Sequence, residues 1–213
     1  MARTQKKAIP IRKAFKESMI SAIGIPEERV TYDDSYWIEK PVSVGRFFGK
    51  FLNEPAYSLQ DEFNVAMVGK KSIEFSDEYD EGHAFWGKGS GKDSNIAKVI
   101  VYAAYKLKCL RNPQKYFRDK YGCSIGDHDQ IDLVNMSINA RQAQNVFFKK
   151  LKAYVRNCKN PRTGNNWFVE KGMDIRDGYD IQNTEIKFSN SISAHSLNSE
   201  THTGEGLNIL LQQ

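Results

Sequence analysis

A glycine-rich turn separates a short apolar run from a long apolar segment, and this order of features constrains the fold more than any other. The turn has the sequence WGKGSGKDS and covers residues 86–94. Residues 83–86 favour a strand, and the stretch NIAKVIVYAAYKLKCL (95–110) favours a helix. A strand, a glycine-rich turn and a helix in this order are typical of a loop that binds phosphate.

The residue types within the turn suit an anionic ligand. Glycines at positions 87, 89 and 91 let the backbone curve around a phosphate with its N–H groups inward, and Lys92 can reach the terminal phosphates. The strict pattern G-x-x-x-x-G-K-[ST] is not met, because Trp86 holds the first glycine position and Asp93 holds the Ser/Thr position. Asp93 can still help to bind Mg²⁺, since carboxylate oxygen is a hard ligand. A glycine-rich hairpin or helix cap without a ligand is the alternative.

Beyond the turn, short apolar runs alternate with helical patterns. The segment IDLVNMSINA (131–140) predicts a strand, residues 140–158 predict a helix with one apolar face, and the segments TEIKFSN and SISAHSLN (184–198) predict two more strands. Such alternation is typical of a mostly parallel sheet flanked by helices. We therefore expect an α/β fold whose sheet is centred on the strand before the glycine-rich turn.

The part of the chain before residue 76 has a different, helical texture. Residues 11–22 have helical periodicity, and two amphipathic stretches, VGRFFGKFLN (44–53) and SLQDEFNVAMVG (58–69), are separated by Pro55. The acidic run at 77–81 reads as a solvated connector. We expect two parts, an N-terminal helical lead over residues 1–75 and the α/β core over residues 76–213.

The composition of the chain indicates which kinds of partner and which cellular compartment to expect. The formal net charge is +5 and the pI is near 9.0, which favours a polyanionic partner, although a solvated basic terminus explains the excess equally well. The sequence contains no apolar run long enough to span a membrane and no secretory signal, so we expect a protein that is not secreted. The three cysteines and four histidines lack the spacing of a zinc site.

Five segments together resemble the large terminase subunits of tailed phages, the ATPases that package viral DNA. They are GKGSGKDS, which is similar to the Walker A loop of that family, PAYSLQDEF (55–63), CLRNPQKYF (109–117), INARQAQNVFFKKL (138–151) and IKFSNSISAHSLNSETHTGEGLN (186–208). The resemblance covers roughly residues 50 to 213. It implies a P-loop NTPase fold of the ASCE type, with ATP and Mg²⁺ as cofactors.

The resemblance also assigns roles to residues. Lys92 would hold the β- and γ-phosphates, and Lys88, where the family has an arginine, would sense the γ-phosphate; these two residues are the catalytic candidates. Asp93 and Ser94 would place the metal, and Gln60, in the segment similar to the family's Q motif, would read adenine. The nucleotide-binding set is therefore Gln60, Gly87, Lys88, Gly89, Ser90, Gly91, Lys92, Asp93 and Ser94.

ATP hydrolysis also requires acidic residues that this sequence does not supply. No apolar run followed by Asp-Glu occurs after the turn, so we expect a fragment that ends before the Walker B acid and is inactive alone. The implied partners are double-stranded DNA, the portal, the small terminase subunit and further copies in a ring, within the cytoplasm of a viral host. A basic nucleic-acid or capsid-partner binding module without ATPase activity, or another P-loop enzyme such as a helicase, remains open.

Overall fold

The structure is a computed structural model. Its described residues belong to one compact unit, Asp33–Gln213. They are residues 35–69, 71–75, 81–83, 85–87, 89–137, 143–189, 191–198 and 207–212. The helix predicted over residues 11–22, most of the acidic run and Lys88 lie outside them.

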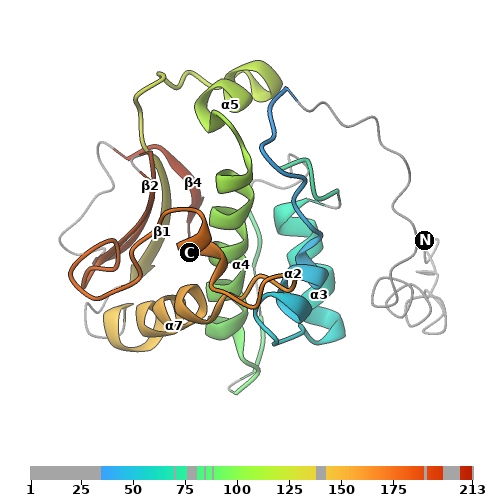
Figure 1. Cartoon of the computed structure of the whole chain (residues 1–213). Helices are drawn as coiled ribbons and strands as arrows, with labels where there is room; N and C mark the ends of the chain where they lie inside the picture. The colour runs from blue at the N-terminus through green and yellow to red at the C-terminus, as the bar shows by residue number, and fades with distance from the viewer. Residues whose placement is uncertain are drawn as a thin grey trace, which may run out of the picture. The chain divides into compact units, whose positions relative to one another are not determined.

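Helix α4 (Lys92–Cys109) is the centre of the unit. Thirteen of its eighteen residues are buried, which explains why its sequence is apolar on nearly every side. In Figure 1, α4 lies between the sheet on one side and helices α2 (Val44–Lys50) and α3 (Ser58–Val68) on the other. The predicted helix after the glycine-rich turn and the two amphipathic helices flanking Pro55 are thus confirmed.

Four strands form a mixed sheet in the order β2-β3-β1-β4. Strand β1 (Ile131–Ser137) pairs in parallel with β3 (Ile192–Asn198) and with β4 (Ile209–Gln212), and β2 (Glu185–Ser189) closes the other edge antiparallel to β3. Residues 131–135 are all buried, as expected for a strand with neighbours on both sides. The predicted α/β fold with a mostly parallel sheet flanked by helices is confirmed, as are its three predicted strands after residue 130.

The prediction of a strand before the glycine-rich turn is wrong, and so is the prediction that the sheet is centred on this strand. His83, Phe85 and Trp86 have no strand structure. The central strand is β1 instead, which pairs with β3 on one side and with β4 on the other. Phe85 instead is 93% exposed, and the Trp86 ring packs edge-on against Phe63 of α3 with centroids 5.4 Å apart.

The helix predicted over residues 140–158 is observed in two parts. A π-helix, η1 (Ala143–Phe148), leads into α7 (Lys149–Asn157), and both pack against α4. Leu151 and Val155 of α7 are buried, while Lys149 is exposed and Lys150 and Lys152 are half-buried. A short helix, α8 (Trp167–Glu170), follows and was not predicted.

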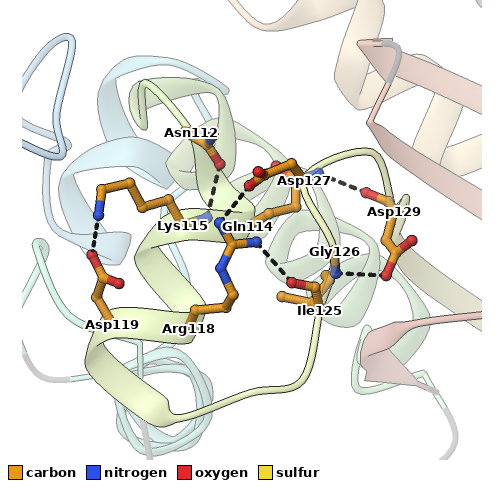
Figure 2. Close-up of polar contacts among 9 residues, drawn as sticks. All are labelled: Asn112, Gln114, Lys115, Arg118, Asp119, Ile125, Gly126, Asp127 and Asp129. Carbon is orange, nitrogen blue, oxygen red and sulfur yellow. Dashed lines mark hydrogen bonds and ion pairs between the residues drawn. The ribbon is translucent and has the colours of Figure 1, made fainter.

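Helix α5 (Pro113–Tyr121) was also not predicted, although its ends carry standard signals. Asn112 accepts a hydrogen bond at its side chain from the Lys115 N–H (2.8 Å), and Gly122 ends the helix at a φ of 65°. Figure 2 shows how α5 holds the segment that leads into β1: Arg118 Nη1 donates to the carbonyl of Ile125 at 2.7 Å, and Gln114 Nε2 donates to the carbonyl of Asp129 at 2.6 Å.

A buried carboxylate ties β4 to the rest of the sheet. Asp132 is 1% exposed; its Oδ2 accepts from the Asn208 N–H at 3.0 Å, and its Oδ1 lies 2.9 Å from His195 Nε2 and 2.7 Å from Gln130 Nε2. Burial by itself raises the pKa of Asp132. The hydrogen bonds to its oxygens outweigh burial, and the pKa is lowered from its usual value. The carboxylate is therefore ionised where it anchors β4.

Among the described residues, no helix has the length and apolar character needed to cross a membrane.

Candidate functional site

The glycine-rich turn is an exposed loop directly before α4. Gly89 and Gly91 have φ values of +84° and +74°, a region that side-chain-bearing residues rarely adopt. The Ser90 N–H donates to the carbonyl of Gly87 at 3.2 Å and closes the turn. Gly87, Gly89 and Gly91 are all exposed, so a ligand can reach this part of the loop.

The first turn of α4 leaves backbone donors available. The first intrahelical bond runs from the Asn95 N–H to the carbonyl of Gly91 at 2.9 Å, so the N–H groups of residues 92–94 precede it. No side chain of the described residues caps the helix at Gly91. Lys92 is exposed at the first helical position. N–H groups that precede the first intrahelical bond, the positive end of the helix dipole and a lysine together attract an anion.

Ser90 adds a polar atom to the same loop. Its Oγ is buried and has no hydrogen-bond partner among the described residues. A buried hydroxyl without a partner costs free energy, so such groups are normally satisfied. An oxygen-rich ligand held by the loop would supply that partner, and this observation fits a phosphate group.

Helix α3 supports the loop from behind through Gln60. The Gln60 side chain is 7% exposed; its Nε2 donates to the carbonyl of Ser90 at 2.9 Å, and its Oε1 accepts from the Tyr57 N–H at 3.3 Å. The structure thus brings Gln60 to the loop, where its amide holds backbone. Its predicted role in reading adenine stays a prediction.

A second amide contact fixes α3 against the start of α4. Asn64 and Asn95 are both fully buried and form two reciprocal hydrogen bonds, of 3.0 Å and 2.6 Å. Gln60 and Asn64 are one helical turn apart, so one face of α3 positions both the loop and the first turn of the helix that follows it. Sequence reasoning missed this pair, because a buried asparagine on an amphipathic helix reads as a polar surface residue.

Asp93 and Ser94, the predicted metal ligands, both contact residues of α7. Asp93 Oδ2 lies 3.9 Å from Lys150 Nζ. Ser94 forms a side-chain hydrogen bond with Tyr154, which in turn donates to Glu54 Oε2 at 2.8 Å. Burial, reinforced by the hydrogen bond to Glu54, raises the pKa of Tyr154 to about 12, so the phenol is neutral.

Asp93 and Ser94 offer two hard oxygen ligands beside the loop, which fits a divalent cation that is also bound by phosphates. No cluster of three or more His, Cys, Asp or Glu side chains suited to a metal occurs in the described part of the chain. Lys150 and Tyr154 were not predicted as neighbours of the loop. The basic face of α7 was visible in the sequence, but its position beside Asp93 depends on how α7 packs on α4.

Comparison of the sequence with known proteins identifies a family that covers most of the chain. The sequence profile of the family described as "Uncharacterized protein MJ0330, N-terminal P-loop domain" matches residues 13–212. The uncharacterized protein MJ0330 of Methanocaldococcus jannaschii is 27% identical over 124 residues, which are 58% of this chain and 20% of that protein. The aligned region is therefore about a fifth of the length of this relative. No solved structure matches.

Proposed function

Because this chain belongs to the P-loop domain family of the MJ0330 amino-terminal type, we propose that it binds ATP together with Mg²⁺ at residues 87–94. The observation that carries the proposal is the exposed glycine loop, with Gly89 and Gly91 at positive φ, which runs into a helix start that no described side chain caps. A glycine-rich loop at the start of a helix is one element that P-loop proteins use to bind phosphates, although the strand that usually precedes it is not observed at His83, Phe85 and Trp86.

Each residue of the loop has a role in this proposal. The N–H groups of residues 92–94 donate to phosphate oxygens, and Lys92 holds the β- and γ-phosphates as a charge-assisted donor. Lys88 senses the γ-phosphate. Asp93 and Ser94 provide oxygen ligands to Mg²⁺, which when bound neutralises charge on the phosphates. Gln60 holds the loop through Ser90 and contributes to adenine recognition.

The finer proposal concerns the machine that the domain serves. We propose that it is the ATP-binding part of a DNA-packaging motor similar to the large terminase subunits, which translocates double-stranded DNA into a procapsid in the cytoplasm of a viral host. The portal, the small terminase subunit and further copies of the motor in a ring are the proposed partners. The five segments that resemble large terminases support this proposal, and the family match supports the P-loop class alone.

Competition between nucleotides tests phosphate recognition. A fluorescent ATP analogue is titrated against the chain with Mg²⁺ present and then displaced by ATP, ADP, AMP or adenosine. Since the loop contacts phosphates, we expect competitors to weaken in that order, with adenosine weakest. GTP in the same series measures how far the adenine base contributes. Adenosine competing as well as ATP, or an analogue that does not bind, would contradict the proposal.

A further inference from the structure

A groove lies beside the proposed nucleotide site. Its volume is about 670 Å³, and it is formed by the end of α2 with the connector that follows, by α7 and by the turn after α7.

The charge of the groove is positive. Three lysines, at positions 50, 150 and 159, line it, against one acidic residue, Glu54. The Glu54 carboxylate accepts a hydrogen bond from Tyr154 at 2.8 Å, whereas Lys50 and Lys159 have no ion-pair partner among the described residues. Helix α7 itself has the sequence KKLKAYVRN, with four cations and no acid, although Lys150 and Arg156 pair with Asp93 and Asp177 of other segments. Such a surface attracts a polyanion.

The lining also contains the hydroxyl of Tyr154 and three amides, at positions 53, 157 and 160. The Asn160 amide donates to Glu170 Oε2 at 2.6 Å, so Asn53 and Asn157 are the amides that argue for a phosphate ligand. Lysines and amides are the groups that contact phosphate and sugar oxygens when a protein holds nucleic acid without reading its bases. The groove is also distinct from the phosphate loop, which has its own donors for a nucleotide. Its chemistry therefore suits a second, longer polyphosphate chain.

We propose that this groove binds the phosphate backbone of duplex DNA, an inference that rests on the proposed function and names the surface through which it meets its substrate. Lys50 and Lys159 are the phosphate contacts. Lys150 is shared between the two sites, because its Nζ lies 3.9 Å from Asp93 at the start of α4. Two contacts thus join the groove to the first turn of α4, where the nucleotide is proposed to bind: Lys150 with Asp93, and Tyr154 with Ser94.

The test replaces the two lysines that do not touch the nucleotide site. Anisotropy of a labelled duplex of about 20 base pairs is measured from roughly 50 to 200 mM salt for the full chain and for Lys50→Gln/Lys159→Gln. We expect weaker binding and a slope of log affinity against log salt that is less steep by about 1.8, or about 0.9 for each lost contact.

Lys115→Gln/Lys120→Gln on α5 is the matched control, because it removes the same charge from exposed lysines. Figure 1 places α5 at the carboxyl end of α4, whereas α7 lies beside the amino-terminal half. The control is expected to keep the full slope. Equal slopes for the two double variants would overturn the groove as the DNA site, as would preference of the groove for single-stranded RNA over duplex DNA.

Binding of the ATP analogue, measured on the same variants, shows whether the groove assignment or the proposed nucleotide site has failed. Lys50→Gln/Lys159→Gln is expected to bind the ATP analogue as the unchanged chain does. If the analogue binds and the DNA slope does not change, the groove assignment is wrong and the nucleotide site stands. If the slope changes and the chain binds no nucleotide, the groove stands as a DNA surface and the ATP proposal fails. Thermal unfolding of each variant checks that it is folded.

Discussion

Lys92→Ala is expected to weaken binding of an ATP analogue by roughly 10- to 100-fold, because a hydrogen bond that involves a charged group contributes about 1.5–3 kcal/mol. Lys92 is exposed at the first position of α4, next to the N–H groups that precede the first intrahelical bond. Its removal takes one positive charge from the phosphates and leaves the loop backbone in place. Titration of the fluorescent analogue measures the change.

Lys120→Ala is the control for this experiment. Lys120 is exposed on α5, away from the loop, and its loss changes the net charge by the same amount. It is expected to leave nucleotide affinity unchanged. If both variants bind the analogue equally well, the phosphates do not lie at the start of α4. The unfolding temperature of Lys92→Ala should stay near that of the parent chain, since an exposed lysine contributes little to stability.

Asn64→Ala is expected to lower the free energy of unfolding by about 3 kcal/mol, because the buried amide of Asn95 loses the two hydrogen bonds that it forms with Asn64 and a cavity remains. Both asparagines are fully buried, and their two hydrogen bonds join α3 to α4. Nucleotide affinity should fall as well, because α3 also holds Ser90 through Gln60. Denaturant unfolding measures the loss of stability.

The double variant Asn64→Leu/Asn95→Leu separates hydrogen bonding from packing. Replacing both partners leaves no unsatisfied amide, so we expect it to be more stable than Asn64→Ala. Asn157→Ala, at an exposed position on α7, is the surface control and should change stability by less than about 0.5 kcal/mol. A loss no larger for Asn64→Ala than for this control would show that the amide pair does not hold α3 in place.

Strands β1, β2 and β3 could be predicted from the sequence, because their apolar residues are buried in the sheet and burial is also what produces the apolar pattern. Strand β4 was not predicted. The same reasoning fails at residues 83–86. A short apolar run does not by itself show where its side chains are buried: here Phe85 is exposed and Trp86 packs on Phe63 of α3 and not in the sheet. Helix α5 was not predicted because its sequence, PQKYFRDKY, is largely polar, so that the residues that cap its two ends are the main sign of a helix.

In the candidate site, too, some features could be predicted from the sequence and others could not. The glycines and Lys92 are neighbours in sequence, so a loop followed at once by the start of a helix could be predicted from that segment, and the structure has this order. Contacts that depend on the packing of separate helices could not. Asn64 meets Asn95 only because α3 docks on α4, and Lys150 reaches Asp93 only because α7 packs beside the same helix.

Backbone amide resonances of the isotope-labelled chain, followed during a titration with ATP and Mg²⁺, test the central claim most directly. If the loop wraps the phosphates, the largest shifts occur at residues 89–94, and tripolyphosphate reproduces most of them, because N–H groups at a helix start respond to an anion bound there. Shifts that avoid these residues, or that adenosine alone produces in full, would contradict the proposed nucleotide site.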